Sequence, residues 1–114
     1  MTNQQFARTA VQGRVVRIKT ESKVTRITVC SNYSYTCGKT GERKSDPHFN
    51  QFVAFNQKPR EIIETFEAGD LVKLEGRVRQ TRFTDREGNV RYGVDLVAWE
   101  AELIAKKKVV QRAA

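Results

Sequence analysis

Residues 71–83, LVKLEGRVRQTRF, alternate apolar and polar side chains with the two-residue period of a β-strand. The first face consists of Val72, Leu74, Gly76 and Val78, which predicts a strand that packs this side on a hydrophobic core. The opposite face carries three cations, one acid and a terminal ring, and it consists of Lys73, Glu75, Arg77, Arg79, Thr81 and Phe83. Cations that neutralise phosphates beside a ring that stacks on bases are what a surface for single-stranded nucleic acid requires.

Length and charge narrow the class of protein. The chain has 114 residues, enough for one domain with one modest core, and its formal net charge is +8. This balance favours a polyanionic partner such as DNA, RNA or an acidic membrane surface, while a small basic protein without such a partner stays an alternative. No stretch approaches the roughly 20 apolar residues of a membrane span. Residues 1–11 are too polar for a signal peptide, so we expect a cytoplasmic protein with no membrane partner.

Metal-binding and catalytic side chains are scarce. The chain has two cysteines, Cys30 and Cys37, and one histidine, His48. Their spacing is not that of a usual zinc site, and no glycine-rich loop that could cradle a phosphate is present. No nucleophile lies beside a base in a suggestive context. We therefore expect no metal, no cofactor and no enzymatic activity.

Turn residues divide the remaining chain into further strands. Residues 32–47 contain few apolar side chains and indicate a long loop or a mobile hairpin, and residues 85–89 indicate a tight hairpin turn. In the strand between them, Phe49 and Phe55 alternate with Phe52, so one of these two sets faces a core unless the strand is buried on both sides. The predicted elements are strands 11–19, 23–31 and 49–55, a helix at 59–67, and strands 71–84 and 90–104. Five strands with one helix between the third and fourth predict an all-β protein with the OB-fold barrel.

The predicted helix has a start signal, an apolar stripe and a stop signal. Pro59 suits the first turn because its missing N–H would have no partner there. Ile62, Ile63 and Phe66 follow the spacing of a helix face. Gly69 is placed to end the helix in the left-handed conformation. The domain itself is predicted to span residues 1–104.

The last ten residues, 105–114, contain four cations and no acid: Lys106, Lys107, Lys108 and Arg112. We expect a basic flexible tail. The tail is either simply solvated or an electrostatic arm that adds phosphate contacts, and the sequence leaves both readings open.

Three segments carry a resemblance to a known family. They are FNQFVAF at 49–55, EAGDLVKLEGRVR at 67–79 and RFTDREGNVRY at 82–92. Across roughly residues 11–104 the chain resembles bacterial-type single-stranded DNA-binding proteins, the SSB family. The combination of these segments is specific, whereas single elements such as the Glu-Gly pair would be weak. The first half matches more loosely.

The resemblance implies a set of nucleic-acid-binding residues. The family stacks bases on aromatic side chains, and the matching positions are Tyr35, Phe49, Phe55 and Phe83. The same match implies that Phe52 faces the core and that Phe49 and Phe55 lie on the outer face of their strand. We expect the cations of the neighbouring strands to contact phosphates, and these are Lys73, Arg77, Arg79, Arg82 and Arg91. The resemblance also implies a homodimer or a homotetramer.

Two functions from different classes follow. The first is sequence-tolerant binding and protection of single-stranded DNA, or RNA, in replication, recombination or transfer. The alternative is an OB-fold adaptor that binds proteins of a replication, primosome or conjugation complex. Main cellular members of the family end in a flexible linker and an acidic tip that recruits other enzymes, and this chain shows neither. We therefore expect a short form in which recruitment through an acidic tip does not occur.

Overall fold

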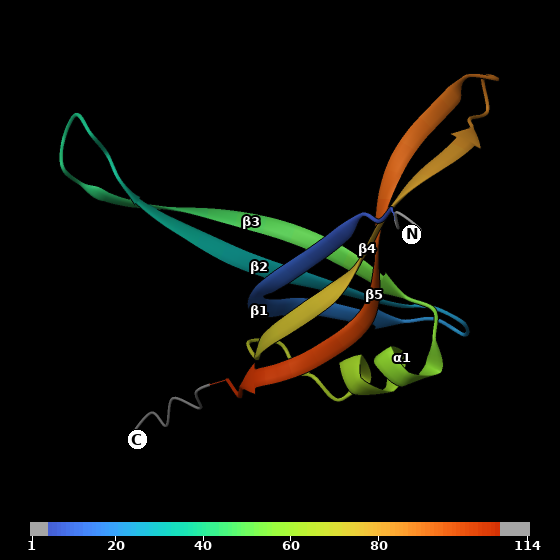
Figure 1. Ribbon diagram of the computed structural model, residues 1–114, viewed down its shortest axis with the longest axis horizontal. Coiled ribbons are helices and arrows are strands. Elements are labelled where there is room, and N and C mark those ends of the chain that lie inside the picture. The colour runs from blue at the N-terminus through green and yellow to red at the C-terminus, as the bar shows by residue number, and fades with distance from the viewer. Residues whose placement is uncertain (1–4, 108–114) are drawn as a thin grey trace.

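Five strands close into one barrel, and one helix lies against it (Figure 1). The computed structural model describes residues 5–107. The elements are β1 (Arg8–Thr20), β2 (Thr25–Thr36), β3 (Arg43–Ala54), α1 (Gln57–Glu64), β4 (Leu71–Thr84) and β5 (Val90–Ala105). Around the barrel the strand order is β1-β2-β3-β5-β4, and only β3 and β5 run parallel. The prediction of an all-β, five-stranded barrel with one short helix between the third and fourth strands is confirmed.

Strand β1 closes the barrel because its two halves pair with different neighbours. Residues 8–14 pair with β4, and residues 14–20 pair with β2. At Gly13, where the strand changes partner, a Cβ atom would overlap the backbone carbonyl of Cys30. Glycine is therefore required for the close approach of the two strands.

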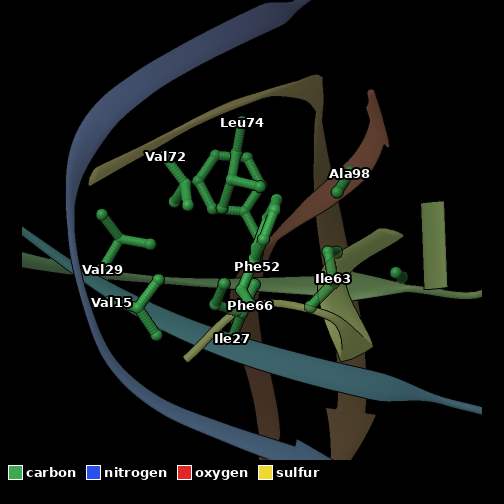
Figure 2. Packing of buried hydrophobic residues seen from close by; sticks show 10 residues of the cluster. Val15, Ile27, Val29, Phe52, Ile63, Phe66, Val72, Leu74 and Ala98 are labelled. Carbon is green, nitrogen blue, oxygen red and sulfur yellow. The ribbon is translucent and has the colours of Figure 1, made fainter. Parts of the chain in front are cut away.

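The core lies inside the barrel and under the helix (Figure 2). Phe52 and Leu74 are fully buried on β3 and β4, and Ile63 of α1 joins them from one end of the barrel. Phe49 and Phe55 point outward with 62% and 42% of their surface exposed, so the predicted faces of this strand are confirmed.

Two hairpins extend beyond the barrel as two-stranded arms that point in different directions (Figure 1). In the β2–β3 arm, strand pairing continues to Thr36 and Arg43, so the hairpin alternative for residues 32–47 is confirmed. The β4–β5 arm ends in the predicted turn at residues 85–89, where Gly88 has a φ of +85°. Val78 keeps its place on the core side of β4 but is 38% exposed. The prediction that it packs in the core was wrong, because the arm begins to leave the barrel at this position.

The helix begins and ends earlier than its sequence signals suggest. It starts at Gln57, so Pro59 is its third residue and is buried, and the chain leaves the helix at Thr65. Gly69 has the expected positive φ of +96°, but it lies beyond the helix and donates its N–H to the carbonyl of Val15. Its role is to bring the connection after α1 onto β1. Within residues 5–107, no helix is long and apolar enough to cross a membrane.

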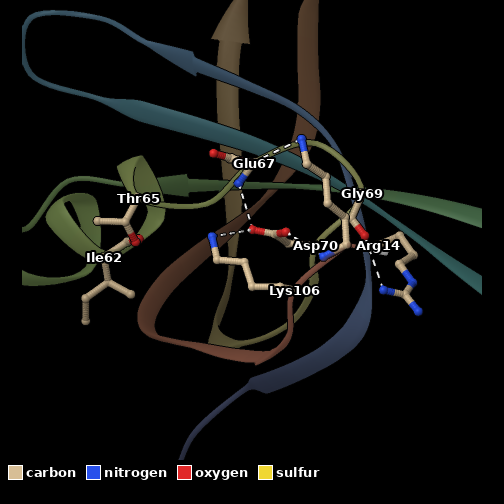
Figure 3. A network of polar contacts seen from close by, with 8 residues as sticks. Arg14, Ile62, Thr65, Glu67, Gly69, Asp70 and Lys106 are labelled. Atoms are coloured by element: carbon tan, nitrogen blue, oxygen red, sulfur yellow. Dashed lines mark hydrogen bonds and ion pairs between the residues drawn. The ribbon is translucent and has the colours of Figure 1, made fainter. Parts of the chain in front are cut away.

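A buried carboxylate joins this connection to the end of β5 (Figure 3). Asp70 is fully buried and accepts hydrogen bonds from the N–H groups of Glu67 at 2.9 Å and Lys107 at 3.0 Å. Lys106 adds its ammonium group at 3.4 Å. The Glu67 N–H, then the Lys107 N–H and Lys106 hold the pKa of Asp70 below its usual value. The first residues of the predicted tail are therefore bound to the barrel, while residues 108–114 lie outside the described residues.

Candidate nucleic-acid interface

The register of three strands builds one continuous outer face. Val53 of β3 pairs with Val97 of β5, which pairs with Arg77 of β4. Paired residues point to the same side of a sheet, so the side chains two residues away in either direction share this side as well. We call this surface the basic–aromatic face, and it consists of Phe49, Phe55, Arg77, Arg79, Phe83 and Arg91.

The rings of this face are exposed rather than packed. Phe49 is 62% exposed, Phe83 is 56% exposed and Phe55 is 42% exposed. Exposed phenylalanines grouped on one face make a surface on which planar apolar groups can stack. Phe49, Phe55 and Phe83 therefore lie on the same side of the sheet, with Phe83 near the end of the β4–β5 arm.

Arg79 links two strands of the face. Its guanidinium carbon lies 5.3 Å from the centre of the Phe55 ring, and one of its Nη atoms donates to Asp95 Oδ2 at 2.8 Å. Its Nε atom is buried and has no hydrogen-bond partner within residues 5–107. Arg79 is thus held in place by a ring and a carboxylate, and its Nε–H group remains available as a hydrogen-bond donor.

Arg91 is oriented by the hairpin turn beside it. Its Nε donates to Asp85 Oδ2 at 3.0 Å, and Asp85 Oδ1 accepts the N–H groups of Glu87 and Asn89 at 3.0 and 2.9 Å. The hydrogen bond from Arg91, followed by those from the turn, lowers the pKa of Asp85. Because Arg91 pairs across the strands with Phe83, the turn places a cation beside the outermost ring.

Two of the expected phosphate contacts do not join the basic–aromatic face as free cations. Lys73 lies on the same side of β4, but its ammonium group is 3.1 Å from Glu75 Oε1. The hydrogen bond and charge of Glu75, together with Glu100 and Glu102, raise the pKa of Lys73. Arg82 pairs with Tyr92 and therefore points to the opposite side of the β4–β5 arm. The expectation that Lys73 and Arg82 share one basic surface with Arg77 and Arg79 was wrong for Arg82.

Tyr35 is separated from the other rings. It pairs with Lys44 on the side of the β2–β3 arm that continues the core side of the barrel, whereas Phe49 lies on the outer side. Tyr33 shares the side of Tyr35, and its ring meets His48 edge-on at 5.2 Å. The structure therefore groups three of the four expected stacking rings and places the fourth on the reverse side of the arm.

One aromatic side chain was missed by sequence reasoning. Arg8 pairs with Arg77 at the edge of the basic–aromatic face, and its guanidinium carbon lies 4.3 Å from the centre of the Phe6 ring. Phe6 is 69% exposed. The signal that could have revealed it is the continued alternation of Phe6 and Arg8 ahead of the predicted start of the first strand. Residues 5–107 contain no group of three or more His, Cys, Asp or Glu side chains placed to hold a metal ion.

Comparison with known proteins identifies the family. The model of the single-strand binding protein family matches residues 6–104. The chain is 26% identical over 82 residues to single-stranded DNA-binding protein 1 of Xylella fastidiosa (strain 9a5c), covering 72% of this chain and 60% of that protein.

Solved structures share the fold at low sequence identity. The Plasmodium falciparum SSB in complex with single-stranded DNA superposes with a TM-score of 0.71 at 16% identity and covers 91% of this chain and 99% of that one. The mitochondrial protein Rim1 of S. cerevisiae gives 0.63 at 16% identity over 90% and 99% of the two chains. The small single-stranded DNA-binding protein of Streptomyces coelicolor gives 0.59 at 17% identity over 88% and 95%. Since the family model covers nearly the whole chain, the protein belongs to the single-strand binding protein family.

Proposed function

We propose that this protein binds single-stranded DNA without sequence preference along the basic–aromatic face. The observation that supports this most directly is the grouping of three exposed rings with three arginines on one side of β3, β5 and β4. Rings stack on any base because every base has a π-face, and arginines take the phosphates. Family membership and the DNA-bound P. falciparum relative point to the same ligand.

The proposed mechanism divides the work between the two kinds of side chain. Phe49, Phe55 and Phe83 stack on bases, each contributing about 1–3 kcal/mol. Arg77, Arg79 and Arg91 neutralise phosphates and release the counterions condensed on them. Tyr35 can stack on the same DNA molecule only where the DNA passes over the edge of the β2–β3 arm. Its role therefore stays a separate prediction.

A binding titration tests the proposal. Fluorescein-labelled oligo-dT is titrated with the protein at several salt concentrations, and binding is followed by anisotropy. Three neutralised phosphates predict a log–log salt slope of about −2, because each contributes about −0.7 on single strands. Equal affinity for a duplex of the same length, or a flat salt response, would contradict the proposal.

The biological setting follows from the ligand. We propose roles in protecting exposed single strands during replication, recombination or transfer, with the cytoplasm as the expected compartment. The homodimer or homotetramer expected from the family is tested by light scattering of the free protein. The adaptor alternative predicts that a variant can lose its affinity for single-stranded DNA and still function in the cell.

A further inference from the structure

The outer side of the sheet continues past β4 onto the residues that lead into β1. Arg8 pairs with Arg77, and the carbonyl of Ala7 accepts a hydrogen bond from an N–H of β4 at 3.1 Å. The antiparallel register continued from this point sets Phe6 opposite Arg79. Because side chains alternate along a strand, Phe6 and Arg8 share the side of the two arginines of β4.

Phe6 is a large apolar side chain that the fold leaves in contact with solvent. With 69% of its surface exposed, it is the most exposed of the large hydrophobic side chains within residues 5–107. The guanidinium carbon of Arg8 lies 4.3 Å from the centre of its ring, which places the two side chains on the same side of the chain. The start of the strand therefore presents a ring and a cation together at the surface, outside the core.

The same combination of ring and cation occurs on the other flank of β4. Among the described residues, an arginine stacks on a phenylalanine ring at two places, Arg79 on Phe55 and Arg8 on Phe6. Phe55 directly follows β3, which β5 separates from β4, whereas Phe6 precedes β1 on the opposite side of β4. In each pair the ring can stack on a base while the guanidinium contacts a phosphate of the same strand. Each pair thus offers both contacts that a single nucleotide needs.

The charges beside Phe6 favour an anion. Arg8 and Arg77 are exposed and lie directly opposite each other in the sheet. Like charges in this position destabilise a pair of strands, and a bound phosphate would relieve the repulsion. The acid two residues away on β4, Glu75, is already paired with Lys73 at 3.1 Å. The Phe6–Arg8 pair therefore adjoins a positive charge that is open to a phosphate.

We infer that Phe6 and Arg8 form a further nucleotide-binding site beside the basic–aromatic face, in which Phe6 stacks on a base and Arg8 contacts a phosphate. This inference rests on the proposed function, because it gives the same single-stranded DNA a longer path. The path crosses the sheet from Phe49 and Phe55 over β5 and β4 to Phe6. Phe6 then supplies a fourth stacking ring on the outer side, where Tyr35 does not lie.

The test varies the ring and the cation separately. Phe6→Ala removes the ring, Phe6→Leu keeps apolar bulk without a ring, and Phe6→Trp keeps a ring. Tyr92→Ala is the matched control, because Tyr92 is 65% exposed on the reverse side of the β4–β5 arm. Masses of complexes with dT strands of graded length give the lengths that bind one assembly of the protein and two. The longest strand that still binds one assembly is then titrated at several salt concentrations and followed by anisotropy.

We expect Phe6→Ala and Phe6→Leu to raise the Kd at least about fivefold, the lower limit for the loss of one stacked base. Phe6→Trp and Tyr92→Ala should stay within about twofold of the wild type. Stacking is not an ionic contact, so Phe6→Ala should leave the log–log salt slope unchanged. Arg8→Gln should make the slope shallower by about 0.7, and the contribution of Arg8 raises the expected wild-type slope from about −2 to about −2.8.

A Kd within about twofold of the wild type in Phe6→Ala, or an equal loss in Tyr92→Ala, would overturn the inference. Full affinity in Phe6→Leu would overturn the stacking role, and an unchanged slope in Arg8→Gln would overturn the phosphate contact. A changed mass of Phe6→Ala without DNA would also overturn the inference, because the ring would then belong to a contact between copies. Failure of the wild type to bind dT at all would instead refute the proposed function.

Discussion

Arg79 and Phe55 meet across the basic–aromatic face, with the guanidinium carbon 5.3 Å from the centre of the ring. Arg79 lies on β4 and Phe55 directly follows β3, and β5 separates these two strands in the barrel. Asp95 of β5 completes the arrangement by accepting a hydrogen bond from Arg79 at 2.8 Å. A cation, a ring and a carboxylate from three strands are therefore fixed together before any ligand arrives.

Asp95 is an anion on a surface that we propose for phosphates, so its removal should strengthen binding. Asp95→Asn should raise affinity for oligo-dT up to about fivefold at low salt, the size of a surface charge effect of up to about 1 kcal/mol, and the gain should vanish at high salt. Asp46→Asn, which removes an acid paired with His48 on the other side of the β2–β3 arm, is the control and should have little effect. A loss of affinity in Asp95→Asn would show that positioning of Arg79 outweighs the repulsion.

Arg77 and Lys73 occupy the same side of one strand but differ in their neighbours. Arg77 is exposed, whereas Lys73 is paired with Glu75 at 3.1 Å. Arg77→Gln should make the log–log salt slope of oligo-dT binding shallower by about 0.7, the contribution of one phosphate. Lys73→Gln should leave the slope unchanged. Equal changes in both variants would show that the acids around Lys73 do not prevent its contact with DNA.

Gly76 lies where the pairing of β4 and β5 shifts by one residue, as glycine within a strand predicts. A Cβ atom there would overlap the backbone carbonyl of Val97, which cannot move without breaking the sheet. Gly76→Ala should therefore lower the free energy of unfolding by about 3 kcal/mol, the upper range for overpacking, as measured by urea denaturation. Gly38→Ala is the control, because its Cβ would meet no atom within 4 Å.

Asp70 makes stability depend on acidic pH in a defined direction. Its pKa is lowered in the fold by the N–H groups of Glu67 and Lys107, followed by Lys106. The stabilisation is therefore complete above the unfolded pKa of about 3.9 and is lost as the pH falls through the folded value. In urea denaturation, Asp70→Asn should be less stable than the wild type by a constant amount from neutral pH to about pH 5, and the gap should narrow below about pH 4. A constant gap down to pH 2 would contradict this role.

The parts of the fold with two clear signals were predicted closely. Strand β4 was expected at residues 71–84 and is found there, because its alternation is regular and a hairpin turn fixes its end. The β2–β3 arm was harder, since both of its sides are exposed and residues 32–47 therefore lack apolar periodicity. Pro59 misplaced the helix start by two residues, because any of the first four helical positions tolerates a missing N–H.

The candidate site was also predicted only in part. The face of Phe83 follows from alternation along its strand. Alternation also separates Phe49 and Phe55 from Phe52, but the family resemblance was needed to tell which of the two sets points outward. The reversed side of Arg82 also follows from its even spacing to Val78, but grouping by sequence proximity obscured it. The pairing of Lys73 with Glu75 could have been read from the alternation of β4, and Glu100 and Glu102 of β5 only add to it. The contact of Arg79 with Phe55 instead depends on the register of β3, β5 and β4. No pattern within one strand contains that information.

The most direct test compares two exposed rings on opposite sides of the same arm. Phe83 lies on the basic–aromatic face and is 56% exposed, while Tyr92 lies on the reverse side and is 65% exposed. Each is replaced by alanine, and the Kd for the shortest labelled dT strand that binds one assembly is measured by anisotropy. We predict that Phe83→Ala raises this Kd by about 5- to 150-fold, as the loss of one stacked base implies, and that Tyr92→Ala changes it by less than about twofold. Equal effects of the two variants, or a larger effect of Tyr92→Ala, would contradict the assignment of the binding face.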